Sequence, residues 1–214
     1  MADTSKIIAA LHKKYPDPRI SLRFSNPLEL LVATMLSAQC TDARVNEVTK
    51  ALFKKYKLAK DYAHADPHVF EEQIRSTGFY KNKAKAIINC CRKLVADFQG
   101  KVPDNLDALT SLPGVGRKTA NMVLGNAFAQ ASIAVDTHVL RVSNRLGLAH
   151  ATQADKVEEE LMQQIPRNKW TAVANALILH GRDTCTAKKP QCGACNLYAL
   201  CAWPEKSRYA LTSP

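Results

Sequence analysis

Apolar residues recur through most of this chain every three to four positions, which is the spacing typical of amphipathic helices. The longest such run extends from Lys81 to Phe98, with apolar residues on one face and basic residues on the other. No segment shows the strong alternation of apolar and polar residues that indicates a half-buried strand. The pattern therefore predicts an all-α fold.

Residues that favour helix N-termini precede several of these runs. The candidate N-caps are Asn26, Thr41, Asp66 and Asp136. The first and third of them are each followed by proline, which is favoured at the first helical position. Further along the chain, Thr152 with Asp155 resembles a capping box for the helix that follows. These signals predict where the helices begin.

A five-residue stretch from Leu112 to Gly116, with the sequence LPGVG, separates two helical runs. Pro113 disfavours helical backbone at the residue before it, so the first helix should end there. Gly114 and Gly116 permit positive φ or the close approach of another backbone. The stretch therefore predicts a helix, a tight hairpin and a second helix whose N-terminus suits a phosphate.

Lys118 lies one residue into that second helix, and on the hairpin alone it would be a phosphate-binding lysine. The chain has 30 Lys and Arg against 19 Asp and Glu, a net charge of +11 over 214 residues. This excess favours a polyanionic partner, although a merely soluble basic protein remains the alternative. Together, the charge and the hairpin predict binding to DNA.

No stretch approaches the roughly 18 to 20 apolar residues that a membrane span needs. The first residues, MADTSKIIAALHKKYP, include an early acid and no long apolar core, so they do not form a secretory signal. We therefore expect an intracellular protein with no membrane partner, located in the cytoplasm or nucleoid if it is bacterial.

Seven cysteines are present, and four of them follow the spacing C-x6-C-x2-C-x5-C. These four are Cys185, Cys192, Cys195 and Cys201. Four thiolates in a loop-rich run indicate a metal site rather than a disulfide framework. The arrangement favours a 4Fe-4S cluster, with zinc as the second candidate, because zinc prefers two separated short pairs. The other cysteines, Cys40, Cys90 and Cys91, are expected in the core.

The hairpin sequence LPGVGRKTAN, the later sequence VDTHV and the four cysteines together resemble the endonuclease III family of the helix-hairpin-helix superfamily. The resemblance covers essentially the whole chain. It implies a bifunctional DNA glycosylase and abasic-site lyase that acts as a monomer on duplex DNA containing a damaged pyrimidine or an abasic site. It also implies a six-helix domain at residues 20–130. A second domain, formed by residues 1–19 and 131–214, carries the cluster, and DNA lies in the cleft between the two.

The resemblance also assigns the chemistry. Lys118 is the nucleophile that forms a Schiff base with the sugar, after which β-elimination cuts the strand 3′ to the abasic site. Asp136 is the catalytic carboxylate, with an N-cap as its alternative role, and the four cysteines hold the 4Fe-4S cluster. A helix N-terminus and the neighbouring Arg117 disfavour a charged amine, whereas an ionised Asp136 nearby would favour one.

Further positions are expected to contact DNA. Gln39 matches a glutamine that pairs with the orphaned base, and Phe79 stands where leucine is common as an intercalating wedge. A core aromatic is the alternative for Phe79, and a structural histidine is the alternative for His138. The expected DNA-binding residues are Gln39, Phe79, Gly114, Gly116, Arg117, Thr119 and His138.

Three other functions share some of these features. A related adenine-mismatch glycosylase lacks the nucleophilic lysine and carries a glutamate in the early helix, where this chain has Ala33 to Leu36 without an acid. A non-catalytic, DNA-binding iron–sulfur protein would need neither Lys118 nor Asp136. A zinc-stabilised binding module is the third rival.

Overall fold

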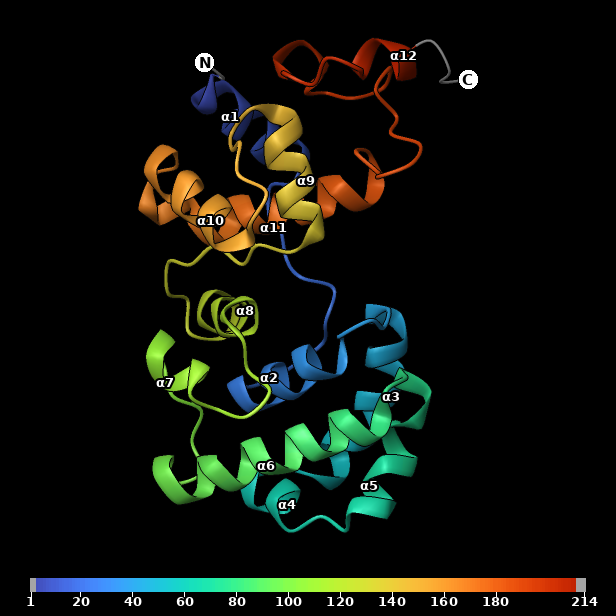
Figure 1. The fold of residues 1–214 in the computed structure, drawn as a ribbon, viewed down its shortest axis with the longest axis vertical. Helices are drawn as coiled ribbons and strands as arrows, with labels where there is room; N and C mark the ends of the chain where they lie inside the picture. Colours follow the sequence, from blue (N-terminus) through green and yellow to red (C-terminus); the bar gives the residue numbers. More distant parts are fainter. Residues whose placement is uncertain (1–2, 211–214) are drawn as a thin grey trace. The chain divides into compact units, whose positions relative to one another are not determined.

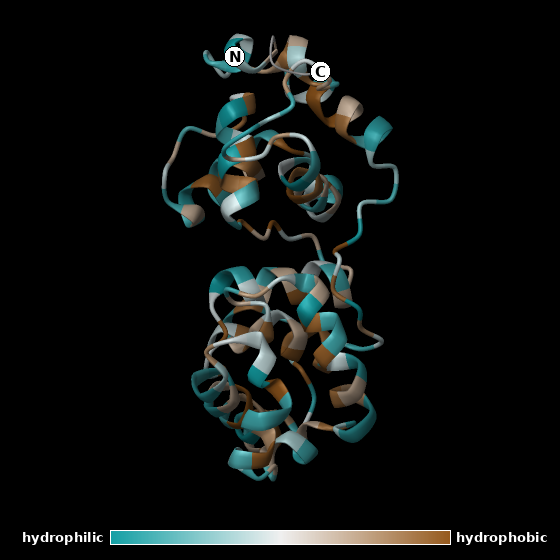
Figure 2. Ribbon diagram, turned by 90° about the vertical axis from the view of Figure 1, so that its right-hand side faces the viewer, coloured by the Kyte–Doolittle hydropathy of each residue, from teal (hydrophilic) through white to brown (hydrophobic). Residues whose placement is uncertain are grey.

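The computed structural model describes residues 3–210, and all the regular elements in that range are helical (Figure 1). The prediction of an all-α fold is therefore confirmed. Teal and brown segments alternate along many of the helical turns in Figure 2, as expected when one face of a helix is buried. Within the described residues, no helix is long and apolar enough to cross a membrane.

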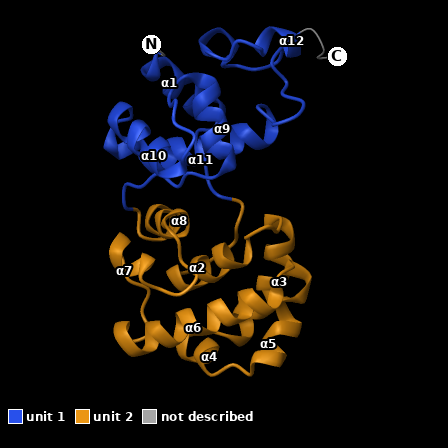
Figure 3. Ribbon diagram, in the orientation of Figure 1, with its two compact units in different colours: residues 1–20, 130–214 blue, residues 21–129 orange. Residues whose placement is uncertain are grey.

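The chain divides into two compact units (Figure 3). Unit 1 contains both ends of the chain, residues 1–20 and 130–214, and unit 2 contains residues 21–129. The helices of unit 2 are α2 (Pro27–Leu36), α3 (Asp42–Lys55), α4 (Ala59–Ala63), α5 (Pro67–Ile74), the 3-10 helix η1 (Arg75–Thr77), α6 (Tyr80–Phe98), α7 (Leu106–Thr110) and α8 (Arg117–Ala127).

The described part of unit 2 thus has seven α-helices, where the family resemblance implied a six-helix domain. The additional one is α4, which contains five residues and is too short to show a helical period. Its position depends on tertiary packing against α6, since short helices are not stable alone.

Three predicted N-caps of unit 2 are confirmed. The side chain of Asn26 accepts a hydrogen bond from the Glu29 amide, that of Thr41 from the Arg44 amide, and that of Asp66 from the Val69 amide. Each side chain supplies a partner for an amide that the helix itself leaves unpaired. The local signals therefore decided where α2, α3 and α5 begin.

Helix α6 packs against α2, α4 and α5 and forms the centre of unit 2. Its inner face carries Ile87 and Leu94, both fully buried. Beside it, Tyr62 stacks on Tyr56 and meets Phe70 edge-on. Cys90 and Cys91 are buried in this core as expected, whereas Cys40 is only half-buried.

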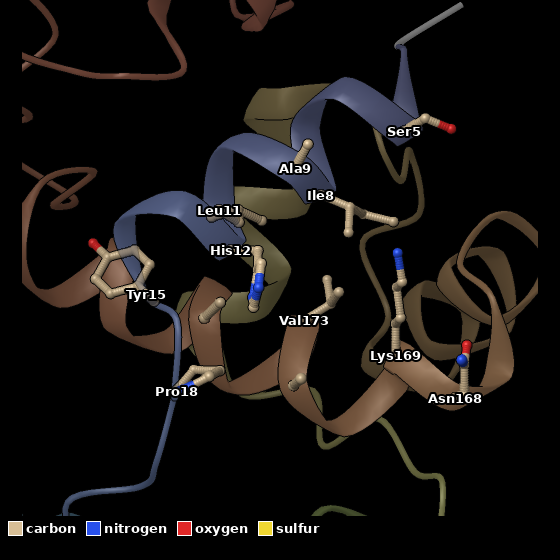
Figure 4. A pocket seen from close by; sticks show the side chains of 12 residues that line it. Ser5, Ile8, Ala9, Leu11, His12, Tyr15, Pro18, Asn168, Lys169 and Val173 are labelled. Carbon is tan, nitrogen blue, oxygen red and sulfur yellow. The ribbon is translucent and has the colours of Figure 1, made fainter.

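Unit 1 contains α1 (Thr4–Lys14), α9 (Thr137–Leu146), α10 (Ala154–Gln164), the 3-10 helix η2 (Arg167–Lys169), α11 (Trp170–Asp183), the 3-10 helix η3 (Tyr198–Leu200) and α12 (Lys206–Ala210). Helix α11 packs on both α1 and α9, which ties the two ends of the chain together. Figure 4 shows a pocket between α1 and α11, where Ile8, Leu11 and Val173 form apolar walls and Lys169 lies at the side.

The capping box predicted from Thr152 and Asp155 is wrong. Helix α10 begins at Ala154, and its N-cap is Gln153, whose side chain makes no capping hydrogen bond. Asp155 instead lies in the first turn, where a carboxylate is favoured by the helix dipole. The acid therefore supports the helix start through its charge, one position away from the register that a capping box requires.

The predicted hairpin lies between α7, which ends at Thr110, and α8, which begins at Arg117. Gly114 has φ +76°, a left-handed conformation that side chains rarely adopt. A Cβ atom at this position would lie 2.9 Å from the Cβ of Ala86 and 3.0 Å from the Cε of Met35. The turn therefore sits directly on α6 and α2, and only glycine fits there.

Gly116 differs from Gly114. Its φ is −89°, and a Cβ atom built on it meets nothing within 4 Å. Neither reason that the sequence suggested for glycine, positive φ or close backbone approach, therefore applies to Gly116 within the protein itself.

These two glycines make a matched pair for testing the turn. Gly114→Ala should lower the stability of the protein by about 1 to 3 kcal/mol, because the left-handed backbone and the contact with α6 both oppose a Cβ atom. Gly116→Ala should leave the melting temperature close to that of the wild type. Thermal unfolding followed by circular dichroism measures both, and equal melting temperatures for the two variants would contradict this account of the turn.

Candidate functional site

The N-terminus of α8 follows the glycine turn directly. Gly116 is its N-cap and offers no side-chain capping bond, and Arg117, Lys118 and Thr119 form the first turn. Arg117 is exposed, while Lys118 and Thr119 are half-buried. The backbone amides and the positive end of the helix dipole attract anions at such a terminus. The site thus combines a backbone anion-binding end with an amine one residue into the helix.

Asp136 begins α9 in unit 1. Its Oδ1 accepts hydrogen bonds from the amides of His138 and Val139, both at 2.8 Å, so the N-cap predicted from the sequence is confirmed. Both bonds go to the same oxygen, and no donor among the described residues contacts Oδ2. Capping therefore occupies one carboxylate oxygen and leaves the other for a ligand.

His138 lies at the second position of α9 and is half-buried. Its Nδ1 lies 3.2 Å from the guanidinium Nη2 of Arg141, and its Cβ would lie 2.9 Å from a Cβ atom built on Gly181. Glycine at position 181 thus allows α11 to pack against this histidine. These contacts with Arg141 and Gly181 are consistent with the alternative role given above for His138, that of a structural histidine.

Arg141 connects α9 to the cysteine segment. Its guanidinium donates hydrogen bonds to the carbonyl of Gly181 at 2.8 Å and to that of Cys185 at 3.1 Å. One turn later, Arg145 donates to the Thr186 carbonyl at 2.9 Å and lies 3.3 Å from the Cys185 sulfur. The guanidinium of Arg145 also covers the ring of Trp203 at 3.9 Å. These cations hold the start of the cysteine segment against α9.

The four C-terminal cysteines line one cavity, together with Leu146, His180 and Trp203. None of the four forms a disulfide. Burial raises the pKa of the Cys192, Cys195 and Cys201 thiols, whereas nearby Arg145 and Lys206 lower that of Cys192 and Cys201. Positive neighbours suit thiolates, which are the form that binds a metal.

This donor set fits an iron–sulfur cluster. Four sulfur atoms facing one cavity match the four thiolate ligands that a 4Fe-4S cluster takes. In residues 3–210, no three His, Cys, Asp or Glu side chains are grouped as they would be around a single metal ion. Lys206 lies beside the cavity, and its ammonium donates to the carbonyls of Cys201 and Tyr198 at 2.6 and 2.9 Å.

Gln39 and Phe79 share an unusual backbone conformation. Gln39, between α2 and α3, has φ 52°, and Phe79, directly before α6, has φ 49°. Both side chains are exposed, and that of Phe79 is 63% exposed. The alternative that Phe79 is a core aromatic is therefore wrong. Left-handed backbone at residues other than glycine is strained and clusters at functional sites.

Sequence reasoning missed Lys83. This lysine is only 7% exposed, and its Nζ donates to the carbonyls of Leu36 and Thr77, each at 2.8 Å. Burial lowers the pKa of its ammonium. A signal was present, because Lys83 falls four residues before Ile87 on the apolar face of the predicted helix.

Comparison with known proteins places the chain in a family. Residues 32–167 match the HhH-GPD superfamily of base excision DNA repair proteins, and residues 185–201 match the iron-sulfur binding domain of endonuclease III. The second match begins at Cys185 and ends at Cys201, the outer members of the cysteine set. The sequence alone left two candidates for the four cysteines, a 4Fe-4S cluster and zinc. This match favours the iron–sulfur cluster.

Relatives resemble the chain over most of their length. Endonuclease III of Synechocystis sp. is 50% identical over 92% of this chain and 90% of its own. Endonuclease III of Bacillus subtilis is 46% identical over 90% and 88%. A structure described as a trapped endonuclease III-DNA covalent intermediate superposes with a TM-score of 0.91 and 44% identity, covering 97% of this chain and 99% of that one. The chain belongs to the endonuclease III family of the HhH-GPD superfamily of base excision DNA repair proteins.

Proposed function

We propose that this protein removes oxidised pyrimidines from duplex DNA and then cuts the strand 3′ to the resulting abasic site. It is a DNA glycosylase with abasic-site lyase activity. The observation that carries the proposal is the position of the Lys118 amine in the first turn of α8, directly after the glycine turn. No side chain caps this helix N-terminus, which suits a phosphate group. The superposable endonuclease III structure, which is described as a trapped covalent intermediate with DNA, supports a covalent route.

Lys118 is the nucleophile in this proposal. Its uncharged amine attacks C1′ of the damaged nucleotide, and the base leaves with the electrons of its bond to C1′. The nitrogen then loses a proton and its lone pair forms the C=N bond of a Schiff base as the C1′–O4′ bond breaks, which opens the sugar ring and leaves a hydroxyl group at C4′. Loss of a proton from C2′ then expels the 3′ phosphate by β-elimination. The helix dipole and the neighbouring Arg117 both disfavour the protonated amine, which makes the first turn of α8 a suitable place for it.

Asp136 supports the same reaction as a carboxylate. Positive charge develops on the sugar as the base leaves, and a nearby carboxylate stabilises it and accepts or returns protons. Two amides hold Oδ1 at 2.8 Å, so the side chain is fixed in one orientation. Oδ2 is then the oxygen that faces the sugar. The capping and catalytic roles are compatible because they use different oxygen atoms.

The damaged nucleotide must leave the duplex before its C1′ can be reached. Phe79 and Gln39 fill the gap: the exposed phenyl ring unstacks a base step, and the amide of Gln39 pairs with the orphaned base. Gly114, Gly116, Arg117 and Thr119 bind the phosphate backbone without reading sequence, and His138 contacts DNA near the lesion. The net charge of +11 strengthens this binding.

The four cysteines hold a 4Fe-4S cluster. A bound cluster would cross-link the segment after α11 through the four cysteine thiolates. Neither base displacement nor β-elimination is an oxidation or a reduction, so the chemistry at the sugar does not require the cluster. Arg145 and Lys206 offset its negative charge and tie the segment to α9 and η3. We assign residues 20–130 to one functional domain, and residues 1–19 and 131–214 to another. A monomer binds DNA through both domains, inside the cell.

The covalent step can be tested by borohydride reduction. Wild-type protein incubated with abasic-site duplex and borohydride should form a trapped protein–DNA complex, visible as a slow band on a denaturing gel. Lys118→Ala should abolish this band, because no amine remains to form the Schiff base. Lys60→Ala removes an exposed lysine from α4 and is the control. Trapping that persisted in Lys118→Ala would remove Lys118 as the nucleophile.

Two substitutions separate the roles of Asp136. Asparagine caps helices as well as aspartate does, so Asp136→Asn should keep the melting temperature and DNA binding while slowing turnover about 100-fold or more. Asp136→Ala also loses the cap and should cost about 1 kcal/mol of stability. Single-turnover cleavage and thermal unfolding distinguish the two variants. Full activity in Asp136→Asn would show that the residue only caps α9.

A further inference from the structure

Lys83 is a buried cation whose place in the fold the proposed chemistry does not use. It lies four residues after Phe79, on the inner face of α6, and is 7% exposed. Its ammonium donates to two carbonyl oxygens, those of Leu36 and Thr77, each at 2.8 Å. Among the described residues it has no carboxylate partner.

The two acceptors are the final residues of two helical segments. Leu36 ends α2 and Thr77 ends η1. Carbonyls at helix C-termini lack partners within the helix, and a positive charge is favoured there by the dipole. One ammonium thus joins two helix ends that are 41 positions apart in the sequence.

Each of these ends leads directly into a strained, exposed residue. Gln39 follows Leu36 by three positions and has φ 52°, while Phe79 follows Thr77 by two positions and has φ 49°. Among the described residues, the Gln39 side chain forms no hydrogen bond, and Phe79 projects into solvent. The positions of both residues therefore depend on their backbones, and Lys83 is the side chain that links those backbones.

The core itself does not require a charged group at this position. Methionine has a similar length and helix propensity, and it would fill the same space without the cost of removing an ammonium from water. What methionine lacks is the ability to donate hydrogen bonds to two carbonyls at once. The amine thus connects the two loops, residues 37–41 with Gln39 and residues 78–79 with Phe79, by bonding to the helix ends that precede them. Filling the core would not require it.

We propose that Lys83 is a positioning residue that holds the Gln39 and Phe79 loops together as one rigid unit for insertion into the base stack. This inference rests on the proposed function, because it assumes that both side chains enter the gap left by the flipped nucleotide. Lys83 acts on unstacking and flipping. It takes no part in the attack of Lys118 on the sugar.

Two DNA substrates separate these steps. A duplex containing thymine glycol requires a base step to be unstacked and an orphaned base to be paired. A single-stranded oligonucleotide with an abasic site requires neither, yet it still forms the Schiff base. Lys83→Met in the cluster-containing protein should slow single-turnover cleavage of the duplex about 100-fold, as expected when reacting groups are misplaced by about 1 Å. Borohydride trapping on the single strand should match the wild type.

Three control variants separate this role from a general loss of stability. Lys93→Met makes the same change at a half-buried position of α6, about 15 Å further along the helix, where the ammonium pairs with Asp97 instead of joining two helix ends, and it should behave as the wild type. Leu94→Ala removes a fully buried side chain from the same helix and lowers the melting temperature. Leu94→Ala should leave the ratio of duplex cleavage to single-strand trapping unchanged. Lys83→Arg keeps a cation with several donors and should restore part of the duplex activity.

A double-mutant cycle tests whether Lys83 acts through the two loops. In a Gln39→Ala/Phe79→Ala background, Lys83→Met should cause no further loss on the duplex, because the side chains that it positions are gone. Iron content and melting temperature are measured for every variant, and if Lys83→Met is not stable the cycle is run with Lys83→Arg.

The outcomes are distinct. Three results would each overturn the positioning role and leave the proposed function intact. The first is an equal loss of activity on the two substrates in Lys83→Met, and the second is a fully additive double-mutant cycle. The third is a change in the ratio of duplex cleavage to single-strand trapping in Leu94→Ala. If the wild type neither cleaves the duplex nor forms a trapped complex with the single strand, the proposed function itself fails. Selective loss on the duplex together with a non-additive cycle supports the role of Lys83.

Discussion

The contact between Gly114 and the helices beneath it is the constraint on which the rest of unit 2 depends. The absence of a Cβ atom lets the turn rest on Ala86 of α6 and Met35 of α2. That contact determines where α8 begins, and therefore where the amides of its first turn and Lys118 are placed. A backbone that approaches its own core so closely presents its other side to a ligand as a rigid surface, which suits phosphate groups bound without regard to sequence.

In unit 1, hydrogen bonds between side chains and the backbone connect α9 to the cysteine segment. Asp136 starts α9, Arg141 ties that helix to Gly181 and Cys185, and Arg145 continues the connection to Thr186. The carboxylate and the cysteine segment are thus parts of one hydrogen-bonded network. A cluster held by the four cysteines would cross-link the segment that Arg141 and Arg145 hold against α9.

Strain and burial are distributed unevenly around the two loops of unit 2. Gln39 and Phe79 have exposed side chains, and their left-handed backbones lower stability. Lys83 is buried and hydrogen-bonded to Leu36 and Thr77, the last residues of the helical segments that precede Gln39 and Phe79. Such a pattern is expected where side chains are presented for insertion, since an exposed aromatic ring gains nothing until it contacts a partner.

The sequence by itself determined the helical class, the starts of α2, α3, α5 and α9, the glycine turn and the set of four cysteines, because these follow from local periodicity, capping chemistry and spacing. Tertiary structure decided what has no local signal. It placed the five residues of α4 in a helix, shifted the start of α10 to Ala154, exposed Phe79 and buried Lys83 between two helix ends. The physical reason is that burial and hydrogen-bond partners depend on residues distant in the chain: the two acceptors of Lys83 lie 47 and 6 positions away.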